Sequence, residues 1–411
     1  MIVGVLAESF PSERRVALVP AVASSLGQMG LEVLVETGAG LGAGFPDAEY
    51  ESSGARIAAN RADVFATADI LVQVRSSGAN PDNGPQDSEL FRSGQVVLGF
   101  LDPLGNPQPV ADLAATGVTS FALELLPRIS RAQPMDALSS MAMIAGYKVV
   151  LLAAQALPRM FPMMMTAAGT ITPAHVFVIG AGVAGLQAIA TARRLGAVVE
   201  AYDIRSAAKE EVQSLGAKFL DLSIEALGAA TGGSPAFPAD DNTGGYAKAM
   251  DEDFYRRQRE EMAKVVSASD VVITTAAVPG RKAPILLTEE MVHGMKPGSV
   301  VVDLAAEFGG NCELTKPGET IEVGGVAILG PVNLPSMVPY HASQMYANNL
   351  AAFLKYLVKD GQVALDLEEP VIGDTLVTHL GEVVNPRVRE ALDLTPLDIT
   401  EDTPEVDGGT S

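Results

Sequence analysis

The stretch from Ala174 to Arg205, AHVFVIGAGVAGLQAIATARRLGAVVEAYDIR, decides how the chain folds. Four segments follow one another in it: an apolar run (175–179), a glycine-rich turn (180–185), a helical segment (186–195) and a second apolar run (197–201). Asp203 follows the second run. Strand, GxGxxG turn, helix, strand and acid in this order are typical of a dinucleotide-binding βαβ unit.

Each glycine of the turn has its own expected purpose. Gly180 allows the tight turn, Gly182 lets a pyrophosphate approach the backbone, and Gly185 lets the helix close on the sheet. The start of the helix then offers N–H groups and a partial positive charge to the phosphates. Asp203 is expected to bind ribose hydroxyls and to repel a 2′-phosphate. The stretch therefore predicts NAD rather than NADP as the cofactor.

Length and charge limit the class of protein. The 411 residues exceed the usual size of one domain and suggest two, and the 48% apolar content is typical of a folded α/β protein. A net charge of −22 argues against nucleic acid and anionic membranes as direct partners. The single cysteine, Cys312, excludes an internal disulfide and fits a reducing cytoplasm.

No segment reads as a membrane span. The residues from Met1 to Leu6 lack a basic region and are expected to form a first strand instead of a signal peptide. The longest apolar stretch, 141–165, is interrupted by Lys148, Arg159 and two prolines. We interpret it as a buried helix followed by a loop, without direct membrane insertion.

Apolar runs alternate with helical segments along the first part of the chain, at 2–6, 31–36, 70–74, 96–100 and 118–123. This alternation predicts a parallel sheet with helices on both faces. We predict an α/β fold of two Rossmann-like domains with parallel sheets, separated by a cleft and joined by long helices. The expected parts are an N-terminal domain (1–140 plus 326–365), an NAD-binding domain (141–325) and an acidic, flexible tail (366–411).

Groups for proton transfer are scarce. The four histidines (His175, His293, His341 and His379) stand outside loops expected to face the glycine-rich turn, although histidine usually moves the proton in a dehydrogenase. Cys312 has no nucleophile context, and no cluster of metal ligands is visible, so no metal site is predicted.

Polar side chains gather instead in PRISRAQPMDALSS, residues 127–140. Asp136 suits the cap of the helix that follows, which is an alternative to a binding role. The arginines, Arg128 and Arg131, suit a pyrophosphate, whereas Gln133, Asp136 and Ser139 suit an amide such as nicotinamide. Because clefts between domains often hold ligands, we expect this block to line such a cleft.

Several separated blocks together resemble the soluble NAD(H)-binding alpha subunit of proton-translocating NAD(P) transhydrogenase, in the alanine dehydrogenase/transhydrogenase superfamily. The blocks are RISRAQPMDALSS (128–140), FPMMMTAAGT (161–170), GAGVAGLQAIATARRLGA (180–197), GGYAKAM (244–250), KPGSVVVDLAAEFGGNCE (296–313) and GPVNLPS (330–336). The resemblance covers roughly residues 1–365.

The resemblance implies an NAD(P)+ transhydrogenase (Si-specific/Re-specific, proton-translocating). Hydride would pass between NADH on this chain and NADP+ on a beta subunit, coupled to a membrane proton-channel subunit. It also implies a homodimer that is cytoplasmic and attached peripherally to the inner membrane through those partners.

The resemblance further implies roles for individual residues. Those that orient the nicotinamide are Arg128, Gln133, Asp136 and Ser139. Those that contact NAD(H) are Arg128, Ile129, Ser130, Arg131, Val183, Asp203, Ile204, Arg205 and Gly245, with Tyr246 in a mobile loop that closes over the cofactor. Two departures affect this set: Pro134 stands where a serine is expected, and the loop before Gly245 is longer than usual.

Alanine dehydrogenase shares the fold and is the natural alternative. Its lysine, histidine and aspartate positions correspond here to Arg75, Asp102 and Glu307, and only Arg15 matches. A non-catalytic NAD-binding protein is a second alternative, disfavoured by Gln133 and Asp136.

Overall fold

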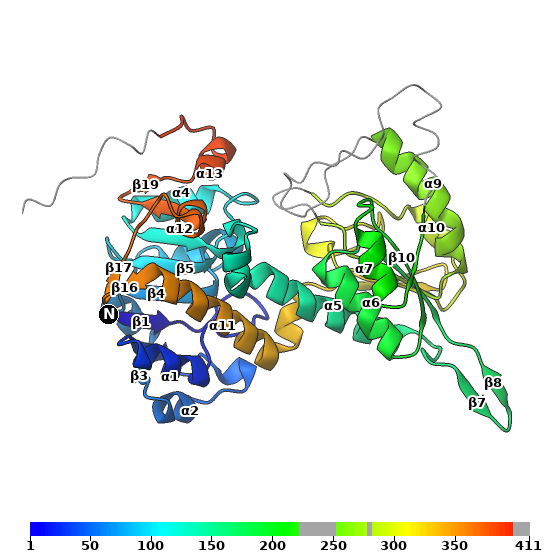
Figure 1. Ribbon diagram of the computed structural model, residues 1–411, viewed down its shortest axis with the longest axis horizontal. Helices are drawn as coiled ribbons and strands as arrows, with labels where there is room; N and C mark the ends of the chain where they lie inside the picture. Colours follow the sequence, from blue (N-terminus) through cyan, green and yellow to red (C-terminus); the bar gives the residue numbers. More distant parts are fainter. Residues whose placement is uncertain (222–251, 278–281, 398–411) are drawn as a thin grey trace, which may run out of the picture. The chain divides into compact units, whose positions relative to one another are not determined.

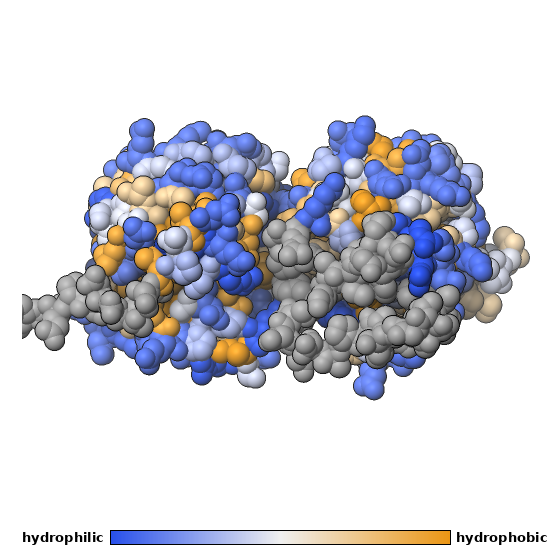
Figure 2. Space-filling view, turned by 90° about the horizontal axis from the view of Figure 1, so that it is seen from above, coloured by the Kyte–Doolittle hydropathy of each residue, from blue (hydrophilic) through white to orange (hydrophobic). Residues whose placement is uncertain are grey.

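The computed structural model describes residues 1–221, 252–277 and 282–397. The chain forms two compact units (Figure 1): unit 1 contains Met1–Ala137 and Tyr346–Ser411, and unit 2 contains Leu138–Met345. Each unit is built on its own sheet with helices packed against it. On the face seen in Figure 2, hydrophilic residues predominate over both units and apolar residues form small patches, in keeping with the acidic sequence.

Unit 1 has an eight-stranded sheet in the order β19-β18-β6-β5-β4-β1-β2-β3. The strands are β1 (Ile2–Val5), β2 (Glu32–Glu36), β3 (Arg56–Ala58), β4 (Ile70–Arg75), β5 (Val96–Phe100), β6 (Thr119–Ala122), β18 (Leu376–His379) and β19 (Glu382–Val383). The six strands from β1 to β6 are parallel, and β18 and β19 are antiparallel additions at one edge. A separate two-stranded ribbon joins β16 (Val358–Lys359) to β17 (Gln362–Val363).

The helices of unit 1 are α1 (Pro20–Gln28), α2 (Asp47–Ser52), α3 (Arg61–Thr67), α4 (Gln108–Ala115), α12 (Pro370–Thr375) and α13 (Pro386–Ala391), with the later part of α11 (Pro339–Leu357). They cover the sheet because each carries an apolar stripe. For example, α3 buries Val64 and Phe65, and α4 buries Val110 and Leu113.

Unit 2 has a seven-stranded sheet in the order β11-β10-β9-β12-β13-β15-β14. The strands are β9 (His175–Ile179), β10 (Val198–Tyr202), β11 (Lys218–Phe219), β12 (Val271–Thr274), β13 (Val300–Asp303), β14 (Thr320–Val323) and β15 (Val326–Leu329). Of these described strands, only β14 runs antiparallel. The central strands are buried on both faces, which explains their unbroken apolar runs. The prediction of an α/β fold with two mainly parallel sheets is confirmed.

The helices assigned to unit 2 are α6 (Val183–Arg194), α7 (Ala208–Ser214), α9 (Glu252–Ala268) and α10 (Glu289–His293), with most of α5 (Ala137–Ala156). By length and composition alone, α5 would suffice to cross a membrane. Its side chains Val149, Val150 and Ala153 are instead part of the core of unit 2. Gly146 packs so tightly that a Cβ there would overlap the carbonyl oxygen of Ala184. This packing makes α5 a core helix.

A hairpin of β7 (Met164–Thr166) and β8 (Gly169–Ile171) projects from unit 2 (Figure 1). It follows α5 and precedes β9, and every residue of its two strands is exposed.

The observed boundaries differ from the expected ones in two places. Residues 326–345 belong to unit 2, because β15 pairs in parallel with β13. Residues 366–397, expected to belong to a flexible tail, form α12, β18, β19 and α13 of unit 1 instead. They are held there by pairing of β18 with β6 and by a hydrogen bond of 2.8 Å between the hydroxyls of Ser120 and Thr378.

Candidate cofactor site

The glycine-rich turn leaves β9 with three glycines that are required for three different reasons. Gly180 has φ +98°, and a Cβ there would lie 2.6 Å from Thr275 Oγ1. Gly185 lies so close to the strand that a Cβ would overlap the carbonyl oxygen of Gly180. Gly182 has no such constraint: a Cβ would meet nothing within 4 Å. Within the described residues, open space at Gly182 is what a ligand that approaches the backbone requires.

The turn lies at the point where the sheet of unit 2 changes direction. From β9 the chain continues to β10 and β11 on one side, and it then returns to β12 on the other side of β9. Ligands of open α/β sheets bind outside the carboxyl ends of the strands at such a switch point. Here those ends are joined directly, because the hydroxyl of Thr275 donates to the carbonyl oxygen of Gly180 at 3.0 Å.

Helix α6 begins at this switch point. Gly182 is its N-cap residue and provides no side-chain hydrogen bond, and Val183 is the first helical residue. A 12-residue helix directs its partial positive charge and its first backbone N–H groups toward this end. The arrangement can therefore hold a phosphate without a basic side chain.

Asp203 ends β10 beside the turn and is only 9% exposed. Its carboxylate accepts hydrogen bonds from the backbone N–H of Ala181 at 2.7 Å and of Arg205 at 2.8 Å. The guanidinium of Arg205 also donates to it at 2.9 and 3.0 Å, and this hydrogen bonding raises the pKa of Arg205. Ile204 between them is partly buried against the core. The acid thus ties the end of β10 to the glycine-rich turn.

The second group of predicted residues lies in unit 1, on the 3₁₀ helix Ser130–Met135. Ala132 and Met135 anchor this helix in the core, and the amide of Asn349 on α11 donates to the carbonyl oxygen of Pro134 at 2.8 Å. Gln133 is exposed on the anchored helix. Pro134 therefore sits in a regular turn that fixes the backbone on either side of it.

The remaining polar residues of this block lie near the surface. Arg128, Ser130 and Arg131 are exposed, and Ile129 and Asp136 are half-buried. Arg131 donates to Glu369 at 2.8 Å, and Glu369 is also the N-cap residue of α12. An exposed ion pair of this kind is weak, so it leaves Arg131 able to exchange partners.

The predicted residues are divided between the units. Gly180, Gly182, Val183, Gly185, Asp203, Ile204 and Arg205 are brought together in unit 2. Ser139 also belongs to unit 2 and lies half-buried in the first turn of α5, whereas the block from Arg128 to Asp136 belongs to unit 1. Gly245 and Tyr246 lie outside the described residues.

A buried polar network behind the switch point was missed by sequence reasoning. Asp303, at the end of β13, is fully buried, and five groups donate to its carboxylate: Thr274 Oγ1 (2.9 Å), Ala305 N (3.0 Å), Asn311 N (2.7 Å), Cys312 N (3.0 Å) and Thr315 Oγ1 (2.7 Å). The only sequence signal for it is an aspartate directly after a buried apolar strand. Removal from water raises the pKa of the neighbouring Cys312 thiol to about 11, so this cysteine is an unreactive core residue.

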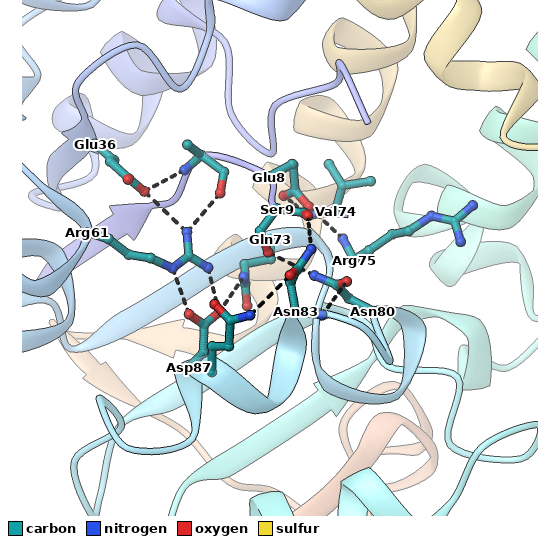
Figure 3. Close-up of polar contacts among 12 residues, drawn as sticks. Glu8, Ser9, Glu36, Arg61, Gln73, Val74, Arg75, Asn80, Asn83 and Asp87 are labelled. Carbon is teal, nitrogen blue, oxygen red and sulfur yellow. Dashed lines mark hydrogen bonds and ion pairs between the residues drawn. The ribbon is translucent and has the colours of Figure 1, made fainter. Parts of the chain in front are cut away.

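Unit 1 has its own switch point, between β1 and β4, and the chain fills it with its own side chains (Figure 3). Glu8 accepts hydrogen bonds from the backbone N–H groups of Val74 at 2.6 Å and Arg75 at 3.1 Å. Removal from water, together with the charge of Glu13, raises the pKa of Glu8 to about 8. Nearby, Arg61 binds Asp87, at 2.7 Å from its Nε.

The positions that matter in alanine dehydrogenase are engaged in internal contacts. The buried guanidinium of Arg15 donates to Glu13 at 2.7 and 2.6 Å. Arg75 lies over the ring of Phe10, 4.2 Å from its centroid. Glu307 accepts a hydrogen bond from the backbone N–H of Asn333 at 2.6 Å, and burial raises the pKa of Asp102.

The four histidines lie on regular elements, with His175 opening β9, His293 ending α10, His341 in the first turn of α11 and His379 ending β18. Among the described residues, no three His, Cys, Asp or Glu side chains are arranged to hold a metal ion.

Comparison with known proteins gives matches over both units. Residues 4–145 match the family model "Alanine dehydrogenase/PNT, N-terminal domain", and residues 149–386 match "Alanine dehydrogenase/PNT, C-terminal domain". The first portion of the NAD(P) transhydrogenase alpha subunit of Rhodospirillum rubrum, a separate chain, is 46% identical over 381 residues, which cover 92% of this chain and 96% of that relative.

Two solved structures are similar along nearly the whole chain. A transhydrogenase from Sinorhizobium meliloti has a TM-score of 0.79 and 45% identity, covering 94% of this chain and 99% of the other. An L-alanine dehydrogenase has a TM-score of 0.77 and 26% identity, covering 96% of this chain and 99% of the other.

Proposed function

Because the chain belongs to the alanine dehydrogenase/PNT family, we propose that it is the NAD(H)-binding alpha subunit of a proton-translocating NAD(P) transhydrogenase. In this reaction hydride passes between NADH on this chain and NADP+ on a beta subunit. The observation that carries the proposal is the glycine-rich turn at the switch point of unit 2, closed by Asp203, in a chain 46% identical to such an alpha subunit.

Unit 2 holds the adenosine diphosphate half of NADH in this proposal. The pyrophosphate lies at the start of α6, against the open side of Gly182 and beside Val183, where the helix terminus favours negative charge. Asp203 accepts hydrogen bonds from the ribose hydroxyls. A 2′-phosphate would place a second negative charge beside this buried carboxylate, which is why NADH is favoured over NADPH.

The block in unit 1 and the start of α5 hold the nicotinamide half. Gln133 and Ser139 bind the carboxamide, Asp136 receives its N–H, and Arg128 and Arg131 neutralise the phosphates. Hydride transfer requires the two nicotinamide rings to meet at about 3–3.5 Å, so rigid presentation matters more than a reactive side chain. The anchored 3₁₀ helix that carries Gln133 supports this role.

The lack of a need for a proton carrier distinguishes this reaction from that of alanine dehydrogenase. Hydride transfer between two nicotinamides removes no proton from the substrate, whereas oxidation of an amine needs a base. The lysine and histidine positions of alanine dehydrogenase hold Arg75 and Asp102 here. An alanine dehydrogenase-like activity, or NAD binding without catalysis, are the alternatives.

The proposed assembly is a homodimer that joins an NADP(H)-binding beta subunit and a membrane proton-channel subunit, on the cytoplasmic side of the inner membrane. The hairpin β7–β8 supports the homodimer, because Met163, Met164, Met165 and Ile171 are exposed by 59, 40, 78 and 42%. No charged residue interrupts residues 160–172. An apolar strand pair of this kind needs a covering surface, and a second copy supplies it.

Stopped-flow hydride transfer tests the proposal. The chain loaded with NADH is mixed with the beta subunit of a transhydrogenase loaded with thio-NADP+, and an alanine/pyruvate assay is run alongside. We expect fast reduction of thio-NADP+ and no alanine-dependent formation of NADH. Alanine-dependent NADH formation would support the dehydrogenase alternative, and tight NADH binding without either reaction would support the non-catalytic one.

A further inference from the structure

Asn311, fully buried beyond the end of β13, spends its whole side chain on two backbone segments. Its Oδ1 accepts a hydrogen bond from the backbone N–H of Ala276 at 3.0 Å. Its Nδ2 donates to the carbonyl oxygens of Ala276 and Pro284, both at 2.8 Å. The side chain therefore fixes both polar backbone groups of Ala276 and ties them to Pro284, eight residues later in the chain.

The backbone of Asn311 is itself held rigidly. Its N–H donates to Asp303 at 2.7 Å, and its carbonyl oxygen accepts hydrogen bonds from Leu286 at 2.8 Å and Leu287 at 2.9 Å. Because Asp303 also binds Thr274 on β12, the position of Asn311 is fixed relative to the ends of β12 and β13. A rigid origin is what a side chain needs in order to position another segment.

Ala276 lies where the glycine-rich turn and β12 meet. The preceding residue, Thr275, donates to Gly180 from its hydroxyl at 3.0 Å and to Ile179 from its backbone N–H at 2.8 Å. Ala276 is thus the first residue that extends past the switch point on the β12 side. The orientation of its peptide groups helps to set the width of the site beside Gly180.

We propose that Asn311 is a positioning residue for NADH. It holds Ala276 in the orientation that leaves room for the cofactor beside the glycine-rich turn, without touching the cofactor itself. The inference rests on the proposed function and adds a residue behind the site. An apolar residue of similar size would fill the space but would leave one N–H and two carbonyl groups without this partner.

The test compares Asn311→Ala with a matched control, Asn385→Ala. Asn385 is also buried, also donates to two backbone carbonyl groups, at 2.9 and 3.1 Å, and also accepts from one backbone N–H, at 3.1 Å, but it lies in unit 1 at the start of α13. Both variants are expected to lower the melting temperature. NADH affinity is measured by the fluorescence of NADH, in a chain that has no tryptophan to interfere.

We expect Asn311→Ala to weaken NADH binding about tenfold, which corresponds to about 1.4 kcal/mol, and to raise the KM for NADH with little change in kcat. Asn385→Ala should leave the affinity unchanged. If Asn311→Ala does not fold, the isosteric Asn311→Asp is used, which is expected to weaken binding because its carboxylate opposes two carbonyl oxygens. NADH affinity within twofold of wild type in a folded Asn311 variant would overturn the inference. A wild-type chain that fails to bind NADH would overturn the proposed function itself.

Discussion

The carboxylate of Asp203 accepts a hydrogen bond from the backbone N–H of Ala181 at 2.7 Å, so the acid that ends β10 is bound to the turn that leaves β9. This relationship gives Asp203 two purposes. It fixes the turn before any cofactor binds, and its buried negative charge lies where ribose hydroxyls are expected. Stability of the turn and choice of cofactor therefore depend on the same side chain.

Asp203→Asn separates these two purposes. The amide oxygen still accepts from Ala181, but the negative charge is gone, so the repulsion of a 2′-phosphate is removed. We expect the preference for NADH over NADPH, measured as the ratio of dissociation constants, to fall at least tenfold, with NADPH affinity rising.

The control is Asp221→Asn, which removes the same charge from an exposed residue of unit 2 paired with Lys209 at 2.8 Å. It should leave the ratio unchanged. An unaltered preference in Asp203→Asn would mean that Asp203 does not face the ribose.

Glu8 predicts an unusual pH dependence of stability. Its pKa is about 8 in the folded chain against an ordinary value of 4.5, because burial and Glu13 disfavour the charged form, although Arg15 opposes this. Between these two pH values the folded chain binds more protons than the unfolded chain, so the free energy of unfolding contributed by Glu8 falls as pH rises. One proton corresponds to at most about 1.4 kcal/mol per pH unit.

Urea unfolding of wild type and Glu8→Gln between pH 5.5 and 7.5 checks this expectation. Glutamine stays neutral, so the decline with pH should be shallower in the variant. Parallel curves for the two proteins would show that Glu8 does not titrate in this range.

The exposed hairpin predicts the association state. Met165→Lys places a charge on the most exposed methionine of β7, and burying that charge against a second copy is costly. We expect the variant to be largely monomeric at concentrations at which wild type is dimeric, measured by sedimentation. Leu380→Lys, at an apolar residue of unit 1 that is 74% exposed, is the control and should stay dimeric. A dimeric Met165→Lys variant would place the interface elsewhere.

The parts of the fold that could be predicted from sequence are those whose signals are local. Buried parallel strands are short apolar runs, and Gly180 and Gly185 mark a backbone that no other residue permits. The place of residues 366–397 could not be predicted, because β18 is four residues long and stands in acidic, proline-rich sequence. Its pairing with β6 depends on a contact between Ser120 and Thr378, which are far apart in the chain.

The supporting residues of the site were missed for a similar reason. Glu369 and Asn311 belong to no motif, and their purpose becomes visible only when Arg131 and Ala276 are placed beside them. Sequence patterns report residues whose backbone or chemistry is special in itself. They do not report polar residues whose importance comes from a partner distant in the chain.

The most direct test of the central claim, that the glycine-rich turn of unit 2 binds NADH, is a titration of Gly182→Ala with NADH. Gly182 has φ −73°, which alanine adopts freely, and the added Cβ meets no atom of the chain within 4 Å. Stability should therefore match wild type within about 0.5 kcal/mol. The companion variant Gly185→Ala should instead be clearly destabilised, because its Cβ overlaps the carbonyl oxygen of Gly180. We predict that Gly182→Ala stays folded and binds NADH at least tenfold more weakly, because the methyl group occupies the space of the pyrophosphate. A folded Gly182→Ala variant with wild-type NADH affinity would contradict the account.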